Sequence, residues 1–226
     1  MTGRADVIAD LLPAAAAAAE SFGPPRYSGL FPAEAAAVAS ANPARRLEFA
    51  AGRAVAHAAL AGLAAPPGPI LPGRGGEPRW PDGVVGRITH CAGYRACAVA
   101  LARDMTAIGI DAEPCLALGD RLLEAVAGDA ERGWLIELSA AVPGIPWDRL
   151  LFCAKEAVYK AWYPHTGGRL DLRSVTVQIS TAGTFTAALP RDPAADPVSG
   201  QPALARLTGR WLAGRGLIIT AVSVPR

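Results

Sequence analysis

The pattern of apolar and polar positions predicts a first group of elements made of one long helix and three short strands. The helix runs from Pro43 to Leu63, because Asn42 is placed to cap its first turn, Pro43 suits that turn and good helix formers follow. Strand patterns come next, two of them joined by a turn at Gly93-Tyr94. The predicted strands are Arg87–Cys91, Arg95–Ala102 and Ala107–Ala112.

A second group of helices and strands follows along the chain. Residues Asp120 to Ser139 carry a helical pattern that is interrupted near Gly128. The clearest helix extends from Trp147 to Tyr163, and Pro164 is expected to end it. Four strands are predicted after this helix, at Ser174–Ser180, Gly183–Leu189, Leu204–Leu212 and Gly216–Val224.

Helices and strands mix in both groups, which predicts the α/β fold class. Two halves of the chain meet near residues 104–108, so the strand Ala107–Ala112 belongs with the second half. We predict an N-terminal half over residues 1–105 and a C-terminal half over residues 106–226. Stretches rich in Pro and Gly are predicted to be loops. They cover residues 24–33, residues 64–83 and Pro190–Pro202.

The balance of charges argues against nucleic-acid binding. The chain has 22 basic and 20 acidic residues and a formal net charge of +2, so any anion site must be local. Only two of the basic residues are lysines, Lys155 and Lys160, and both fall in the helix from Trp147 to Tyr163. Lysine offers a compact ammonium group where arginine offers a planar fork. This placement indicates two positions that favour an ammonium group.

The cysteines and the first twenty residues bear on the compartment. The cysteines lack the paired spacing of a zinc site or a disulfide framework, so we expect reduced thiols and a cytoplasmic protein. Asp6, Asp10 and Pro13 interrupt the alanine-rich start, which argues against a signal peptide. No apolar run approaches the roughly 18 residues of a membrane helix, so no membrane association is expected. The cysteines are Cys91, Cys97, Cys115 and Cys153.

Asp111 and Glu113 stand two residues apart at the end of a predicted strand. Side chains alternate along a strand, so both carboxylates point to the face opposite Ile110. Like charges this close repel unless a cation joins them, and ligation by oxygen alone suits Mg²⁺. The alternative is a strand end that emerges into solvent before the loop at Pro114.

A helical wheel places Lys155 inside the apolar stripe of its helix, between Tyr159 and Trp162. A lysine there must extend to the surface, pair with an acid or meet a ligand anion. Glu156 lies at the edge of the stripe, and with Lys160 it makes an i,i+4 pair worth only about 0.2–0.5 kcal/mol. Together with the strand carboxylates, the set fits a Mg²⁺–pyrophosphate site instead, with Lys155 on a phosphate oxygen and Glu156 as metal ligand, general base or both.

Two further groups of side chains are candidates for phosphate contacts. Thr89 and His90 end a predicted strand, where donors can meet a phosphate, although a lone histidine is more often structural. Arg45 and Arg53 lie two turns apart on the first long helix, and Arg74 lies in the following Gly-rich loop. Such arginines usually form a solvated face; the alternative is that the three hold a terminal phosphomonoester.

Taken together, these segments resemble the Sfp-type 4'-phosphopantetheinyl transferases, especially the branch that serves enterobactin synthase and its actinobacterial relatives. The matching motifs occur in the family's order between residues 45 and 163. Four motifs in order are more specific than any one alone. They are Arg45–Arg53, Trp80-Pro81 through Thr89-His90-Cys91, Gly109–Pro114 and Phe152–Lys160.

The resemblance implies a pseudo-two-fold arrangement of two similar α/β halves with coenzyme A in the cleft between them. It implies Mg²⁺-dependent transfer of phosphopantetheine from coenzyme A to a serine of an apo acyl or peptidyl carrier protein, with release of 3',5'-ADP. Glu156 would help to deprotonate that serine. The implied ligands are Asp111, Glu113 and Glu156 for Mg²⁺; Thr89, His90, Lys155 and Lys160 for the phosphates; Arg45, Arg53 and Arg74 for the 3'-phosphate; and Tyr159 for the pantetheine arm.

Two positions depart from the family pattern: Arg87 stands where many relatives have serine, and Arg169 stands where several have an aromatic residue. One alternative is another Mg²⁺-dependent enzyme of nucleotide pyrophosphates, which the lack of a P-loop or G-x-G-x-x-G pattern disfavours. The other is a binding module without chemistry, which the intact set of carboxylates and Lys155 disfavours. A monomer is expected, since the two halves would supply both sides of the cleft.

Overall fold

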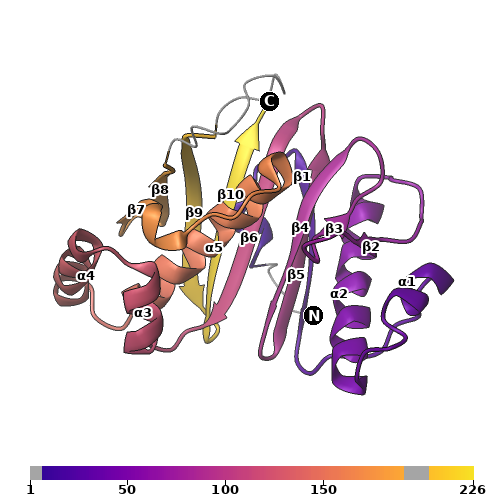
Figure 1. Ribbon diagram of the computed structural model, residues 1–226, viewed down its shortest axis with the longest axis horizontal. Coiled ribbons are helices and arrows are strands. Elements are labelled where there is room, and N and C mark those ends of the chain that lie inside the picture. The colour runs from indigo at the N-terminus through magenta and orange to yellow at the C-terminus, as the bar shows by residue number, and fades with distance from the viewer. Residues whose placement is uncertain (1–6, 191–203) are drawn as a thin grey trace, which may run out of the picture. The chain divides into compact units, whose positions relative to one another are not determined.

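The computed structural model describes residues 7–190 and 204–226, which form two compact units. The first unit extends to Ile108 and includes Pro225–Arg226, and the second covers Gly109–Val224. Each unit combines helices with a β-sheet, which confirms the α/β fold class (Figure 1). The predicted loop Pro190–Pro202 lies, except for its first residue, outside the described residues.

The first unit is built on an antiparallel sheet of three strands in the order β1-β5-β4. The predicted hairpin is confirmed: β4 (Val84–Cys91) and β5 (Tyr94–Leu101) pair across a turn in which Gly93 has a φ of 75°. In the middle of the sheet, every residue of β5 except Leu101 is buried. This explains why the segment has a nearly continuous apolar sequence.

Strand β1 (Ala16–Phe22) was not predicted, because its alanines favour a helix by intrinsic propensity. The strand instead pairs with β5, with Ala16 opposite Ala100. Small side chains suit this position: a Cβ atom added to Gly62 of the covering helix would lie 3.0 Å from the Ala17 Cβ atom. Packing against the helix therefore overrides local propensity here.

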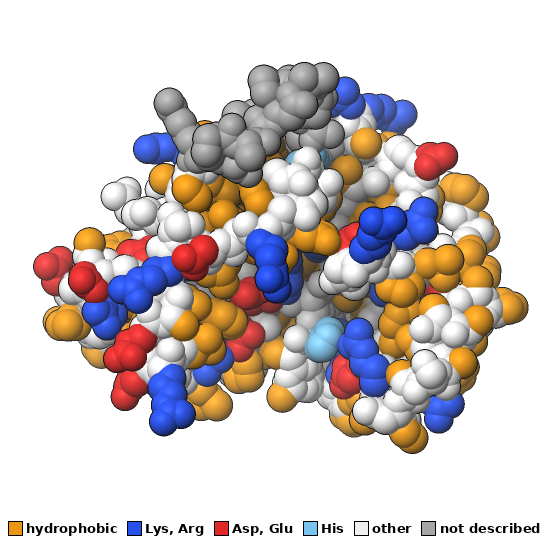
Figure 2. Space-filling model, in the orientation of Figure 1, with side chains coloured by type: hydrophobic (Ala, Val, Ile, Leu, Met, Phe, Trp, Pro, Cys, Tyr) orange, Lys and Arg blue, Asp and Glu red, His pale blue; other side chains and the backbone are white. Residues whose placement is uncertain are grey.

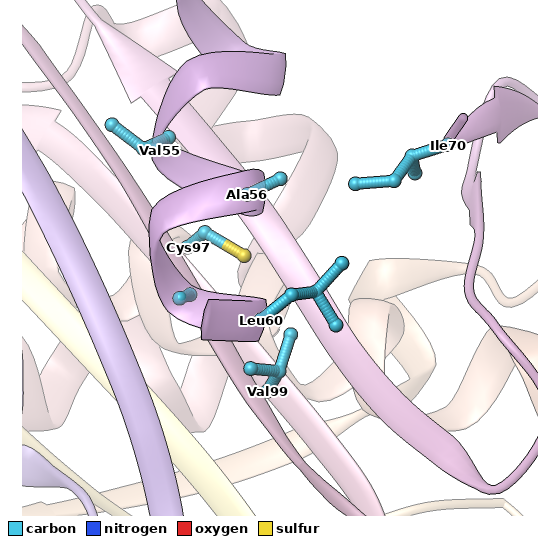
Figure 3. Close-up of a cluster of buried hydrophobic side chains, with 7 residues drawn as sticks. Val55, Ala56, Leu60, Ile70, Cys97 and Val99 are labelled. Atoms are coloured by element: carbon cyan, nitrogen blue, oxygen red, sulfur yellow. The ribbon is translucent and has the colours of Figure 1, made fainter. Parts of the chain in front are cut away.

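Helix α2 (Pro43–Gly62) covers this sheet and confirms the predicted helix, including its cap. The Asn42 side chain accepts a hydrogen bond of 2.8 Å from the Arg45 N–H group. A cluster of buried side chains joins α2, β5 and the segment at Ile70 (Figure 3). Its members are Val55, Ala56, Ala59, Leu60, Ile70, Cys97 and Val99.

Short elements complete the first unit. Helix α1 (Pro32–Ala37) begins inside a predicted loop, and its Glu34 caps the helix by accepting from the Phe31 N–H group. The remaining elements are the 3-10 helix η1 (Ala9–Leu11) and the strands β2 (Leu71–Pro72) and β3 (Pro78–Arg79), which pair with each other.

The second unit contains a sheet of five strands in the order β6-β10-β9-β8-β7. The predicted strand 107–112 lies within β6, and the four strands predicted after residue 173 are all present with shifts of up to two residues at their ends. A tight turn at Arg215-Gly216, both with positive φ, joins the last two strands. The bounds are β6 Met105–Pro114, β7 Thr176–Ser180, β8 Thr184–Ala188, β9 Arg206–Gly214 and β10 Leu217–Pro225.

Three helices accompany this sheet. The predicted break near Gly128 is confirmed, since α3 (Asp120–Val126) and α4 (Asp129–Ala141) are separate helices. Helix α5 (Trp147–Thr166) is preceded by a loop, and the short 3-10 helix η2 (Leu172–Ser174) leads into β7.

The predicted end of α5 at Tyr163 was wrong, because the helix continues through Pro164 to Thr166. Proline costs a helix one N–H donor, but its fixed φ is compatible with helical backbone. The helix stops where Gly167 takes a φ of 61° and donates its N–H to the Tyr163 carbonyl at 2.8 Å.

Charges of both signs are interspersed on α3 and α4 on the face shown in Figure 2. Arg132 donates to Asp129 one turn earlier on α4, for example. The side chains drawn there form no field of one sign. In the part of the chain that the structure describes, no helix combines the length and the apolarity needed to cross a membrane.

Gly109 of β6 sets how closely α5 approaches the sheet. A Cβ atom at this position would collide with the Ala157 carbonyl oxygen and lie 2.7 Å from the Ala161 nitrogen. The backbones of strand and helix are therefore in direct contact at this point. Any side chain at residue 109 must push α5 away from β6.

We predict that Gly109→Ala lowers the free energy of unfolding by about 1–3 kcal/mol, as overpacked cores do. Gly133→Ala is the matched control, because Gly133 is exposed inside α4 and its added Cβ meets nothing within 4 Å. That control should gain about 0.5–1 kcal/mol from helix propensity. Urea denaturation of the three proteins measures both values, and an equal effect of the two substitutions would contradict the packing argument.

Candidate active site

Asp111 lies on β6, two residues beyond the contact at Gly109, and is buried with 4% of its surface exposed. The Lys160 ammonium group on α5 donates to its Oδ1 atom at 2.5 Å. Burial alone would lower the pKa of Lys160, but the charge and hydrogen bond of Asp111 and the charge of Glu156 together outweigh it, and the pKa is raised. Lys160 is therefore held in its charged form beside the carboxylate.

Glu113 forms the second ion pair of the site. The Arg149 Nη1 atom donates to its Oε2 atom at 2.9 Å, and both side chains are about one-fifth exposed. The same guanidinium group also donates to the carbonyl oxygens of Leu116 and Ala117, at 3.1 and 3.0 Å. Arg149 thus fastens the end of β6 and the following loop to α5.

Arg149 is a residue that the sequence reasoning missed. Its signal was present, because Arg149, Glu156 and Lys160 recur at i, i+7 and i+11 and so share one face of α5. That face is distinct from the apolar stripe on which the wheel analysis concentrated.

Glu156 completes a group of three carboxylates with Asp111 and Glu113. The pKa of Glu156 is raised, first by burial and then by the charges of Asp111 and Glu113, against the opposing charge of Lys160. The pKa of Glu113 is likewise raised by burial and by Asp111, while Arg149 lowers it. The charges of neighbouring carboxylates therefore raise the pKa of both Glu113 and Glu156.

The three carboxylates together fit a hard divalent cation, because they offer oxygen ligands and their negative charges repel one another. As the side chains stand, Lys160 and Arg149 neutralise two of the carboxylates. Within residues 7–190 and 204–226, no three acidic, histidine or cysteine side chains are already clustered tightly enough to hold a metal ion.

Cys153 is fully buried on α5, near enough to Asp111 for that charge to act on its thiol. Its Sγ atom is 3.3 Å from the Thr220 hydroxyl oxygen on β10. Burial, followed by the charge of Asp111, raises the pKa of the thiol well above its ordinary range. The thiol stays protonated, so Cys153 is a packing residue here and not a nucleophile.

Lys155 lies on α5 with no exposed surface, in agreement with its place in the apolar stripe. Its ammonium group pairs with the Glu131 carboxylate on α4 at 2.7 Å. Burial lowers the pKa of Lys155 and the bond to Glu131 opposes this. Of the three possibilities for a lysine in that stripe, the structure shows the pairing with an acid. The phosphate contact of Lys155 stays a prediction.

The predicted phosphate-binding residues of β4 lie in the first unit. Thr89 is buried and His90 is exposed, opposite Ala96 and Arg95 of β5. Arg87, which replaces the serine of many relatives, is buried with 5% of its surface exposed. The alternation along β4 therefore places His90 on the opposite face from Arg87 and Thr89.

The three predicted arginines have different surroundings. Arg45 and Arg74 are exposed, whereas Arg53 is buried. The Arg53 Nε atom donates to the Ile70 carbonyl oxygen at 2.6 Å, and its guanidinium carbon lies 4.1 Å from the centre of the Phe49 ring. Burial lowers the pKa of Arg53, while the carboxylate of Glu34 raises it.

Tyr159, predicted to line the pantetheine channel, is half-buried on α5. Its ring centre lies 5.6 Å from that of Tyr163 and 6.5 Å from that of Trp162. Arg169, which replaces an aromatic residue of several relatives, is exposed beyond the end of α5. The aromatic side chains around Tyr159 therefore come from α5 and not from residue 169.

Comparison with known proteins covers both units. The model of the 4'-phosphopantetheinyl transferase N-terminal domain matches residues 33–100, and that of the 4'-phosphopantetheinyl transferase superfamily matches residues 107–213. The chain is 51% identical over 196 residues to the 4'-phosphopantetheinyl transferase Svp of Streptomyces mobaraensis, an alignment that spans 86% of this chain and 78% of that protein. The chain belongs to the 4'-phosphopantetheinyl transferase superfamily.

Two other relatives of this transferase extend the match. This chain is 43% identical to the transferase PptT of Mycobacterium tuberculosis, in an alignment that spans 79% of this chain and 78% of PptT. It is 41% identical to the transferase Npt of Nocardia iowensis, over 96% of this chain and 99% of that one. The family resemblance inferred from four motifs is thereby confirmed.

The raised pKa of Glu156 predicts how metal-free transferase responds to pH. A carboxyl group with a raised folded-state pKa stabilises the fold below its unfolded pKa, and this is lost as pH rises through the folded value. Glu156→Gln should therefore be more stable than wild type at pH 7–8, with a difference that fades below about pH 4.3. Urea denaturation in a chelator measures this.

The control for this comparison is Glu137→Gln, which changes an exposed glutamate of α4. Its effect on the free energy of unfolding should be small at every pH. A Glu156→Gln protein that is less stable than wild type at pH 8 would contradict the predicted repulsion among the carboxylates.

Proposed function

We propose that this transferase moves 4'-phosphopantetheine from coenzyme A to a serine of an apo acyl or peptidyl carrier protein and releases 3',5'-ADP. The proposal rests on three carboxylates that repel one another, those of Asp111, Glu113 and Glu156, in a chain of this superfamily. The Lys160 ammonium group lies beside Asp111. We further propose a cytoplasmic monomer. The four cysteines are free thiols, which supports a reducing compartment.

Asp111, Glu113 and Glu156 would hold Mg²⁺. The ion would supply positive charge to the pyrophosphate of coenzyme A, which needs neutralisation before a nucleophile can approach. The support for this assignment is the oxygen-only donor set and the repulsion among its members. Because Lys160 and Arg149 balance two of the charges, the free protein can hold the carboxylates together without the ion.

Lys160 is proposed to contact the phosphates directly, with Thr89 and His90 as further donors. The Lys160 side chain is one-quarter exposed and its ammonium group is held in the charged form, so it can exchange one oxygen partner for another. Tyr159, one residue earlier on α5, would line the path of the pantetheine arm. Lys155, in contrast, is fully buried beside Glu131.

Glu156 is proposed as the general base. The hydroxyl proton of the carrier serine would pass to its carboxylate as the serine oxygen bonds to the β-phosphorus. The bond between that phosphorus and the bridging oxygen breaks, and 3',5'-ADP leaves with the electron pair. The raised pKa of Glu156 supports this role, because it makes the carboxylate a better proton acceptor near neutral pH.

Arg45, Arg53 and Arg74 are proposed to bind the 3'-phosphate of coenzyme A. Two of them are exposed side chains that can move onto an anion, and Arg53 is fixed by Ile70 and Phe49. One fixed guanidinium group together with two adaptable ones suits a phosphomonoester, since the fixed fork loses little entropy when it binds.

The proposal is tested by incubating the protein with coenzyme A, Mg²⁺ and an apo carrier protein and weighing the carrier. We expect the mass to rise by one phosphopantetheine group, only with divalent metal. Glu156→Gln should reduce turnover by about 10²–10⁴-fold, the span of general acid–base catalysis. Glu137→Gln should keep full activity. Transfer without metal, or an unchanged mass with every plausible carrier, would refute the proposal.

The 3'-phosphate assignment is tested with Arg74→Ala. A charge-assisted hydrogen bond of about 1.5–3 kcal/mol corresponds to about 10–150-fold in affinity. Because this side chain is exposed and solvent screens its charge, we expect KM for coenzyme A to rise by a smaller factor, about 5–30-fold. KM for 3'-dephospho-coenzyme A should stay the same. Arg103→Ala, with a side chain 78% exposed, is the control. An equal rise of KM for both substrates would place Arg74 elsewhere.

A further inference from the structure

The surroundings of Lys155 account for its whole hydrogen-bonding capacity. Its ammonium group donates to the Val126 carbonyl oxygen at 2.6 Å, to Glu131 Oε2 at 2.7 Å and to the Leu172 carbonyl oxygen at 3.0 Å. A lysine ammonium group has three N–H bonds, so each has a protein acceptor. None of its surface is exposed.

Glu131 is equally committed. Besides Lys155, its Oε2 atom accepts from the Gly128 N–H group at 3.0 Å, and its Oε1 atom accepts from the Val177 N–H group at 2.9 Å. The side chain is only 8% exposed. The two side chains thus join five separate elements. They connect α5 to the end of α3, the start of α4, η2 and β7.

The same helix presents the functional side chains on another face. With Lys155 at zero and 100° per residue, Glu156 and Lys160 lie roughly 100° and 140° around the helix axis. A helix fixed at one azimuth by three hydrogen bonds cannot rotate, so the direction of the other two side chains is fixed as well. The contact at Gly109 sets the distance of α5 from β6, but a glycine does not set its rotation.

We infer that Lys155 is a positioning residue that acts through Glu131: the buried pair fixes the rotation of α5 and so aims Glu156 and Lys160 at Asp111. This rests on the proposed function, because it assigns Lys155 a part in the same reaction. It differs from a phosphate contact in one testable respect. A phosphate contact needs the ammonium group itself, whereas positioning needs a balanced, buried pair.

A double-mutant cycle distinguishes these two roles. Lys155→Met leaves the Glu131 charge buried without its cation, which strongly perturbs its surroundings. Lys155→Met combined with Glu131→Gln removes both charges and keeps an acceptor for Val177. We expect the single substitution to lower kcat by about 100-fold, the usual effect of a misplaced catalytic group. The double substitution should recover to within about tenfold of wild type.

KM separates the outcomes further. For positioning, KM for coenzyme A should stay within about threefold of wild type in the double variant. The double variant lacks the ammonium group but leaves no unpaired buried charge. If its KM for coenzyme A rises by tenfold or more, Lys155 contacts the substrate directly and the inference is overturned. Wild-type kcat in a folded Lys155→Met protein would overturn it as well.

A second variant covers the case in which Lys155→Met does not fold. Lys155→Arg keeps the charge, but a planar fork does not match the three oxygens around the ammonium group. We expect a folded protein with reduced kcat and nearly unchanged KM; unchanged kcat would favour a phosphate contact. If neither single variant folds, the KM of the double variant decides alone. Failure of the proposed function itself would appear in wild type, as absence of transfer.

Discussion

The direct contact between α5 and β6 at Gly109 is the constraint on which the candidate site depends. Because no side chain separates the two backbones, the residues that follow Gly109 on the strand face the middle of the helix at short range. Asp111 therefore meets Lys160, and Glu113 meets Arg149. A side chain at residue 109 would push α5, and with it Lys160 and Arg149, away from β6.

That proximity also explains the electrostatic character of the site. Three carboxylates in a partly buried place are costly, and two cations on one face of α5 offset the cost. Lys160 illustrates the point, since its position four residues after Glu156 suggested an ordinary surface pair. In the structure its ammonium group donates to Asp111 on the strand. The helix thus carries both the base and the counter-charges of the site.

Local patterns predicted the elements with strong local signals, and long-range packing decided the others. The Asn42 cap correctly predicted α2, and the break at Gly128 correctly predicted two separate helices, α3 and α4. The wheel also placed Lys155 inside the apolar stripe, but its partner Glu131 lies on another helix, and no spacing rule connects the two. The alanine strand β1 was missed for the same reason, because pairing with β5 and contact with α2 outweigh propensity. That Arg149 shares a face of α5 with Glu156 and Lys160 was accessible from helical periodicity alone.

The two fully buried thiols have a practical consequence. Cys97 lies in the core of the first unit and Cys153 in that of the second, and burial raises the pKa of each far above neutrality. Neither sulfur can be alkylated while its unit stays closed, because reagents need both access and a thiolate. Each cysteine is therefore a native reporter of opening in its own unit. The rates at which the two react would reveal whether the halves of the chain unfold together or one before the other.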